Sequence, residues 1–209
     1  TLVSLENTTN KGGGAIWDFQ EMKAIKEVCT AHGLKFHLDG ARLWNALAVT
    51  GEDPKLYGNL FDSISVCLSK GLGCPVGSVL LGSKDFIAKA LRVRKVFGGG
   101  MRQAGFLAAA GIYALDHHRE RLKEDHKKAK EIEAILSEKD FIASVSPVDT
   151  NIIIFELNES VLDTEAFMHK MDENNIRLIS MGSGKLRLVT HLNYTDEMHS
   201  HLLSILNRF

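Results

Sequence analysis

The sequence predicts an α/β protein with two domains: a large domain built on a mostly parallel sheet, and a small C-terminal α/β domain. Strand and helix patterns alternate over the first two thirds of the chain, with connections long enough for right-handed crossovers. A long, partly charged helical pattern follows, and a second alternation of strand and helix patterns fills the last third.

The large domain begins with a strand pattern, TLVSLEN, and an amphipathic helix over residues 17–32. Asp18 is the expected N-cap of this helix, and Gly33 is its expected end. GLKFHLDG then has the pattern of a short strand, and a helix over residues 41–50 is expected to end at Gly51.

Two further strands are predicted in the large domain, at FDSISVCLS and SVLLGS. Ser83 opens another helix that extends to about Phe97. Residues 101–139 have one continuous helical pattern, apolar at first and then heavily charged, which predicts a single long helix. We therefore expect the large domain at residues 1–115, a linking helix at 116–139 and the small domain at 140–209.

The small domain is expected to contain a strand at NIIIFEL and a helix over residues 164–174. Two strands, IRLIS and KLRLVTHL, flank an MGSG turn, and a final helix follows. In KLRLVTHL the leucines alternate with Arg187, so this arginine is expected to face away from them.

The composition narrows the class of partner and the compartment. The 209 residues are 44% hydrophobic and carry 25 basic and 26 acidic side chains, so nothing favours nucleic acid or an acidic membrane surface as a partner. Cys29, Cys67 and Cys74 have no CxxC spacing and lie among apolar residues, which predicts reduced thiols and a cytoplasmic protein. The chain begins without methionine, in a strand pattern, so we expect that a preceding part is absent.

Ionisable residues follow two of the predicted strands. Asp39 follows GLKFHL and Lys70 follows SISVCLS, about one strand, helix and strand apart. In open α/β sheets ligands bind beyond the carboxyl ends of the strands, so the two side chains could share a pocket. A lysine that forms a Schiff base, with an aspartate for a pyridinium nitrogen, is the protein half of a pyridoxal phosphate site. Alternatively, Asp39 caps the helix beginning at Ala41 and Lys70 is a solvated loop residue.

Three motifs indicate a family. HLDGARLWNALA, SVCLSKGLGCPVGS and RKVFGGGMRQAGFLAAAGIYAL together resemble the L-threonine aldolases, and ENTTN and KLRLVTH extend the resemblance over nearly the whole chain. That family has the aspartate aminotransferase-like fold of fold-type I pyridoxal 5'-phosphate enzymes. The resemblance implies cleavage of L-threonine or L-allo-threonine to glycine and acetaldehyde by a homodimer or homotetramer.

The resemblance also implies roles for individual residues. Lys70 matches the lysine that binds the cofactor, and Asp39 matches the partner of the pyridine nitrogen. Arg42 matches an arginine near the ring's 3-hydroxyl group and the substrate carboxylate; we expect it one helical turn beyond Asp39. Arg187 matches the arginine that binds the substrate carboxylate, for which a planar guanidinium is well suited. The alternative for both arginines is an ordinary surface position.

Lys95 and Arg102 flank the glycines of FGGG. The resemblance implies that they help to hold the cofactor phosphate, either of their own subunit or across a subunit interface. Glycines allow backbone N–H groups to approach a phosphate, and a helix beginning near Met101 would direct its positive end toward it.

The histidines are expected to have no ligand role. His37 shares a strand face with Asp39 and is expected to be packed or hydrogen-bonded, while His117, His118 and His126 are expected to be solvated. No spacing of histidines and cysteines suggests a metal site.

The resemblance places several functional groups upstream of this chain. In the family an upstream part supplies the residue that stacks on the pyridine ring, further phosphate contacts and the histidines discussed as bases. We expect that this part has been removed from the chain or lies in a separate chain. The base could also be a water. Alternatives are another fold-type I enzyme, such as a serine hydroxymethyltransferase or a beta-eliminating lyase, and a non-catalytic fragment.

Overall fold

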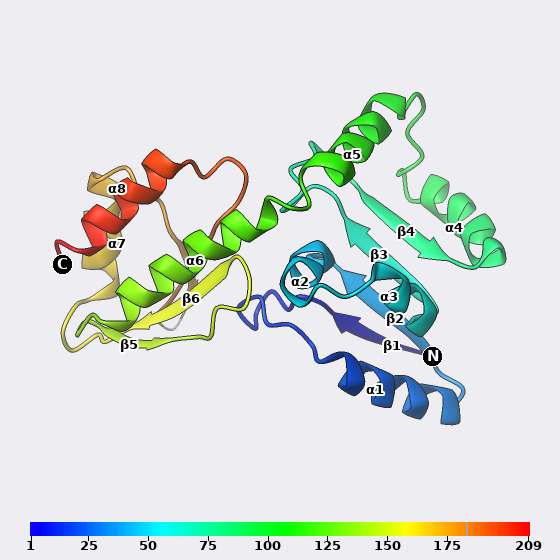
Figure 1. Cartoon of the computed structure of the whole chain (residues 1–209), viewed down its shortest axis with the longest axis horizontal. Coiled ribbons are helices and arrows are strands. Elements are labelled where there is room, and N and C mark those ends of the chain that lie inside the picture. Colours follow the sequence, from blue (N-terminus) through cyan, green and yellow to red (C-terminus); the bar gives the residue numbers. More distant parts are fainter. Residues whose placement is uncertain (183) are drawn as a thin grey trace. The chain divides into compact units, whose positions relative to one another are not determined.

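The structure is a computed structural model that describes residues 1–182 and 184–209. This part of the chain divides into two compact units. The first unit comprises Thr1–Thr9 and Ile16–Leu122, and the second comprises Asn10–Ala15 and Lys123–Phe209. Each unit contains one sheet with helices packed against it (Figure 1).

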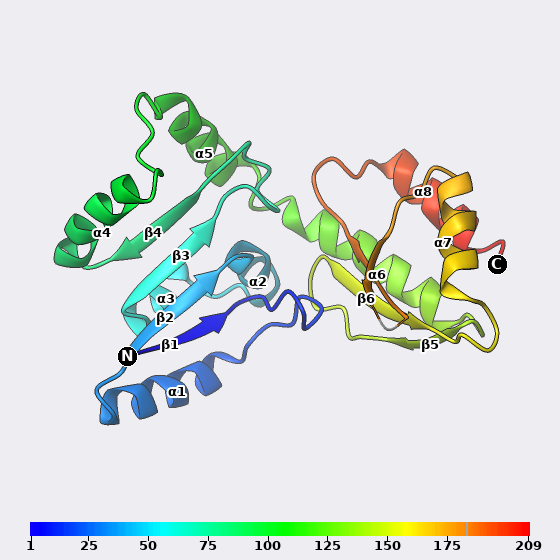
Figure 2. The ribbon, with the colours of Figure 1, turned by 180° about the vertical axis from the view of Figure 1, so that it is seen from behind.

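The sheet of the first unit has the strand order β1 (Leu2–Glu6), β2 (Lys35–Gly40), β3 (Ser63–Cys67) and β4 (Ser78–Gly82). β1, β2 and β3 run parallel, as the arrowheads in Figure 2 show, and β4 runs antiparallel to β3. The expected mostly parallel sheet is confirmed. β4 reverses direction because a loop, without a crossover helix, joins it to β3.

The helices of the first unit are α1 (Phe19–Ala31), α2 (Leu43–Thr50), α3 (Pro54–Leu60), α4 (Lys84–Val96) and α5 (Gly105–His117). Three of them, α1, α2 and α4, begin and end close to the predicted positions. The carboxylate of Asp18 accepts hydrogen bonds from two backbone N–H groups in the first turn of α1, and the hydroxyl of Ser83 caps α4. The sequence analysis missed α3, although Asp53 caps it and Pro54 is its first residue.

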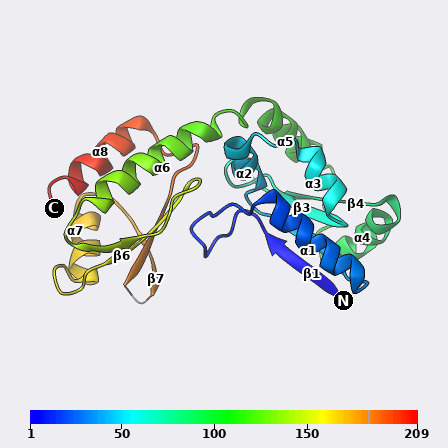
Figure 3. The same ribbon diagram turned by 60° about the horizontal axis from the view of Figure 1, so that its bottom comes forward.

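The two faces of the first sheet differ in polarity. Phe36 and Leu38 point to one face and are completely buried against α1, α2 and α3. Figure 3 shows α1 lying along β1 on this side. His37 and Asp39 point to the opposite face, as expected, and His37 Nδ1 lies 2.8 Å from the hydroxyl oxygen of Ser63. His37 and Asp39 therefore lie on the face of the sheet that these helices do not cover.

The single long helix expected over residues 101–139 is wrong. α5 ends at His117, and α6 (Leu122–Ser137) begins after a turn. The chain turns because His118 is half-buried and its Nδ1 lies 2.7 Å from the backbone oxygen of Leu72. His118 is therefore not the solvated residue that we expected, and no continuous helix covers 116–139.

The second unit is an α/β domain of Asn10–Ala15 and Lys123–Phe209, so it includes α6 and an N-terminal segment that the predicted domain at 140–209 left out. Its sheet is antiparallel with the order β5 (Ile142–Val145), β6 (Ile152–Leu157), β8 (Lys185–Val189) and β7 (Ile179–Gly182). α6, α7 (Thr164–Glu173) and α8 (Asp196–Leu206) contribute to one apolar core with this sheet. The sequence analysis missed β5, and the predicted MGSG turn includes Ser183, which lies outside the described residues.

Two further observations concern membrane spans and cysteines. Among residues 1–182 and 184–209, we find no helix with the length and apolar character that a bilayer crossing requires. Cys29, Cys67 and Cys74 are free thiols.

His126 on α6 is buried, which contradicts the expectation that it is solvated. Burial lowers its pKa from 6.5 to about 4. Between these two pH values the unfolded chain binds a proton that the folded chain does not, so stability is complete above pH 6.5 and decreases as the pH falls toward 4. We expect a loss of about 3 kcal/mol in the free energy of unfolding across this range.

The measurement is urea unfolding, followed by circular dichroism, at several pH values between 7.5 and 4. His126→Gln should remove most of this pH dependence, because glutamine does not titrate. The matched control is His169→Gln on α7, which replaces an exposed histidine of the same unit and should retain the slope. An unchanged slope in His126→Gln would contradict the assignment.

Candidate active site

Asp39 lies at the carboxyl end of β2, in the middle of the parallel strands. It pairs in register with Glu6 of β1 and with Ser65 of β3. Its side chain is exposed, and no hydrogen bond or ion pair to this carboxylate is present in the described part of the chain. The alternative role as a helix cap is wrong, because the N-cap residue of α2 is Arg42 and the Asp39 carboxylate makes no hydrogen bond to α2 within the described residues. The carboxylate is thus available to a ligand.

Lys70 follows β3 in a loop that is well anchored. The backbone oxygen of Lys70 accepts a hydrogen bond from Gly73 at 2.9 Å, and that of Leu68 accepts one from Cys74 at 3.1 Å. Leu72 is buried in a small apolar cluster, and His118 contacts its backbone oxygen. The Lys70 side chain itself is exposed and has no ion pair within the described residues. A fixed loop therefore presents a solvent-accessible amine beyond the end of β3.

Asn7 and Thr8 follow β1 at the same edge of the sheet. Both are completely buried, and the backbone N–H of Asn7 donates to the backbone oxygen of Asp39 at 2.9 Å. Within the described residues, neither the side-chain amide of Asn7 nor the hydroxyl of Thr8 has a hydrogen-bond partner. Buried polar groups without partners are unusual and costly, so these side chains are candidates to hydrogen-bond a polar ligand.

Arg42 lies just beyond β2, but the geometry we expected for it is wrong. Asp39 is in the strand and Arg42 is the N-cap of α2, with φ −135° and ψ 34°. The two residues therefore do not lie one above the other on a helical turn. Arg42 is half-buried at the start of α2.

Lys95 and Arg102 lie on either side of the glycines that follow α4, and both are exposed. The N–H groups of Gly98 and Gly99 donate to backbone oxygens in the last turn of α4, at 3.1 and 2.8 Å. They close the end of α4, so they are not the open phosphate cradle that we expected. The helix start expected near Met101 is also wrong, because α5 begins at Gly105.

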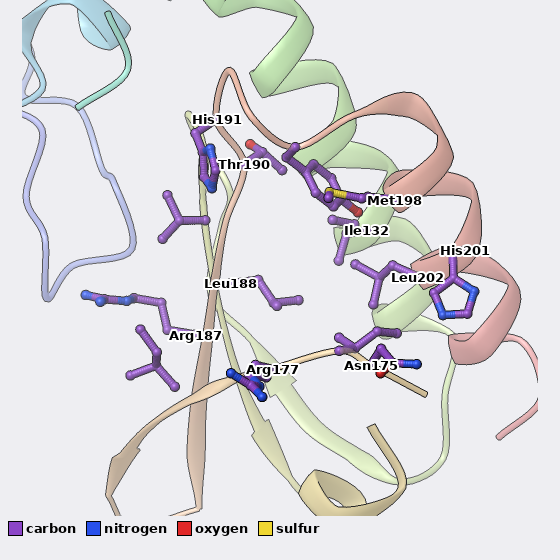
Figure 4. A pocket seen from close by; sticks show the side chains of 14 residues that line it. Ile132, Asn175, Arg177, Arg187, Leu188, Thr190, His191, Met198, His201 and Leu202 are labelled. Carbon is purple, nitrogen blue, oxygen red and sulfur yellow. The ribbon is translucent and has the colours of Figure 1, made fainter. Parts of the chain in front are cut away.

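Arg187 belongs to the second unit, on β8. Leu186 is completely buried in the core, whereas Arg187 is half-buried and points to the other face, as predicted. Its Nη1 donates to the side-chain oxygen of Asn10 at 3.2 Å. Figure 4 shows the arginine extending from β8 away from Leu188 and Leu202.

A pocket of about 430 Å³ lies beside β8 in the second unit. Leu188, Leu202 and Ile132 provide apolar surface on the helix side of the strand, and Arg177 and His201 also line the pocket (Figure 4). The guanidinium of Arg187 is directed to the other side of the strand. The apolar part of this pocket is therefore not where that guanidinium could bind an anion.

Comparison with known proteins shows the family of this chain. Residues 1–160 match the family model described as Beta-eliminating lyase, which is well over half of the chain. The chain belongs to the beta-eliminating lyase family. The matched range includes Asn7, Asp39 and Lys70, which lie at the carboxyl edge of the first sheet.

Curated aldolases are similar to this chain over almost its whole length. The low-specificity L-threonine aldolase 1 of Arabidopsis thaliana is 42% identical over 205 residues, which are 97% of this chain and 57% of that protein. The chain thus spans a little over half the length of this relative.

Solved structures confirm the predicted fold class. The threonine aldolase of Leishmania major matches with a TM-score of 0.81 at 24% identity, over 99% of this chain and 60% of that one. The histidinol-phosphate aminotransferase of Clostridium acetobutylicum matches with a TM-score of 0.71 at 16% identity, over 98% of this chain and 62% of that one. This chain therefore has the aspartate aminotransferase-like, fold-type I architecture.

Sequence reasoning missed three residues that lie at or near the candidate site. Asn7 and Thr8 follow a strand directly, which is the same signal that identified Asp39 and Lys70. His118 gave no such signal, because its contact with the Lys70 loop joins residues 46 positions apart. In the described part of the chain no group of three or more His, Cys, Asp or Glu side chains is arranged to hold a metal ion.

Proposed function

We propose that this chain forms part of a pyridoxal 5'-phosphate-dependent L-threonine aldolase, which cleaves L-threonine or L-allo-threonine to glycine and acetaldehyde. The observation that carries the proposal is the 42% identity to a low-specificity L-threonine aldolase over 97% of the chain. The exposed amine of Lys70 and the exposed carboxylate of Asp39, at the ends of neighbouring strands, support it independently.

The residues at the edge of the first sheet fit pyridoxal phosphate. The amine of Lys70 is free to bind the cofactor's aldehyde carbon, and the carboxylate of Asp39 can hold a proton on the ring nitrogen. The side chains of Asn7 and Thr8, which have no hydrogen-bond partner among the described residues, supply buried donors and acceptors at the end of the strand next to that of Asp39. When bound, the cofactor supplies an electron-accepting ring that stabilises negative charge at the substrate's α-carbon.

Four basic residues complete the proposed site. We assign the substrate carboxylate to Arg187, with Arg42 near the ring's 3-hydroxyl group and the same carboxylate. Lys95 and Arg102 are assigned to the cofactor phosphate, through their side-chain charges rather than through the N–H groups of the preceding glycines. The free thiols support a reducing compartment such as the cytoplasm, and we propose a homo-oligomer.

The test is release of acetaldehyde from L-threonine by the protein that contains this chain, supplied with pyridoxal phosphate but without tetrahydrofolate. We expect acetaldehyde and glycine in equal amounts, together with a visible absorbance band that borohydride bleaches. A requirement for tetrahydrofolate would indicate a hydroxymethyltransferase, and release of ammonia with a keto acid would indicate a beta-eliminating activity. Absence of both the band and the products would favour a non-catalytic role.

A further inference from the structure

The segment Asn10–Ala15 is part of the second unit, although the residues on both sides of it belong to the first. Its contact with β8 is the hydrogen bond from Arg187 Nη1 to the Asn10 side-chain oxygen, at 3.2 Å. In Figure 4 Arg187 extends away from the apolar core residues Leu188 and Ile132. Asn10 therefore contacts the outward-facing end of this arginine.

The guanidinium of Arg187 is held in place but remains short of acceptors. Its Nε is buried and has no hydrogen-bond partner within the described residues. No carboxylate there forms an ion pair with it, and the acceptor that it does have, the Asn10 amide oxygen, is neutral. A neutral acceptor orients a guanidinium without cancelling its charge, so the charge stays available to an anionic ligand.

The position of Asn10 is secured at the far end of the segment. The Thr150 hydroxyl is buried and donates to the backbone oxygen of Gly14 at 2.9 Å. Gly14 has φ +79°, and a Cβ atom at this position would lie 2.5 Å from the Thr150 hydroxyl oxygen. Only glycine fits this backbone, and its lack of a side chain lets the segment lie close to β6. The hydrogen bond from Thr150 then anchors the segment there. This anchor keeps Asn10 within reach of β8 in the same unit.

We propose that Asn10 is a positioning residue for Arg187. It holds the guanidinium through one N–H group, so that other N–H groups of Arg187 meet the carboxylate of the amino-acid substrate. The neutral amide is essential to this role, because an acidic side chain at position 10 would take the place of the substrate carboxylate. The inference rests on the proposed binding of the substrate carboxylate by Arg187.

The decisive comparison is between Asn10→Ala and the isosteric Asn10→Asp. Loss of the hydrogen bond from Arg187 to the neutral Asn10 acceptor in Asn10→Ala should raise the dissociation constant of glycine and the KM for L-threonine about two- to tenfold, with kcat nearly unchanged. Asn10→Asp should raise both constants by more than tenfold, because the carboxylate of the aspartate pairs with Arg187. A purely structural role predicts the reverse order, since aspartate has the shape of asparagine and alanine leaves a gap.

Glycine binding is followed through the cofactor absorbance, and methylamine is the control ligand because it has the amine of glycine without the carboxylate. Methylamine binding should be the same in the parent protein and both variants. Lys11→Ala, at the exposed neighbouring position, is the matched control and should leave all constants unchanged. Equal glycine constants in Asn10→Asp and the parent would overturn the proposal.

A double-mutant cycle separates this inference from the function on which it rests. If Asn10 acts through Arg187, then Asn10→Ala should have no further effect on glycine binding in an Arg187→Ala background. If Arg187→Ala itself binds glycine normally, the proposed role of Arg187 is wrong. If Arg187→Ala weakens glycine binding and Asn10→Ala adds its full effect to it, only the positioning role is wrong.

Discussion

Replacement of Lys70 by alanine should abolish borohydride-trapped cofactor and reduce turnover of L-threonine by about a thousandfold or more. The side chain is exposed and makes no ion pair within the described residues, so its loss should not unfold the protein. The Lys70 loop should persist, because backbone hydrogen bonds, the burial of Leu72 and the contact with His118 hold it. The expected result is a folded variant that binds pyridoxal phosphate without a covalent bond.

The measurement is mass spectrometry of peptides after borohydride reduction, together with acetaldehyde release. In the parent protein the cofactor adduct should map to Lys70. The matched control is Lys55→Ala, which removes another exposed lysine of the first unit and should retain both the adduct and turnover. An adduct that persists on another lysine in Lys70→Ala would show that Lys70 is not the cofactor lysine.

Replacement of Asp39 by asparagine should reduce turnover by about a hundredfold or more while leaving the cofactor bound. The amide has nearly the shape of the carboxylate but cannot hold a proton on the ring nitrogen as a negative charge does. Since Asp39 is exposed and has no side-chain partner in the described chain, the fold should tolerate the change. Asp39→Glu keeps the charge at a longer reach and should recover part of the activity.

The readouts for Asp39 are the cofactor content of the purified protein and the rate of acetaldehyde release. Asp116→Asn, on the exposed surface of α5, is the matched control and should behave like the parent protein. Asp39→Asn with full turnover would remove Asp39 from the ring nitrogen. Loss of cofactor together with unfolding would indicate that the carboxylate supports the sheet edge instead.

Local patterns in the sequence predicted the elements that carry Asp39, Lys70 and Arg187. Alternation along GLKFHLDG separated the buried Phe36 from Asp39, and alternation along KLRLVTHL separated Leu186 from Arg187. These predictions hold because side-chain direction in a strand depends only on the parity of the position. The motifs of the same strands and loops also indicated the family, since they join several residue types at fixed spacings.

The features that were missed or wrong depend on contacts between distant residues. The break after α5 follows from the contact of His118 with the Lys70 loop, and the burial of His126 depends on what packs around α6. Hydrogen bonds that close the end of α4 use the N–H groups of Gly98 and Gly99, which the glycine run alone left open to a phosphate.

Local sequence patterns were therefore sufficient to predict the fold class, the strands next to Asp39 and Lys70, and the face of β8 that carries Arg187. The place of Asn10–Ala15 in the second unit and the contact of Asn10 with Arg187 depend on tertiary packing. The bond from Thr150 to Gly14 that anchors this segment joins residues 136 positions apart. No local propensity encodes such a contact, because it forms only when two separately patterned parts of the chain pack together.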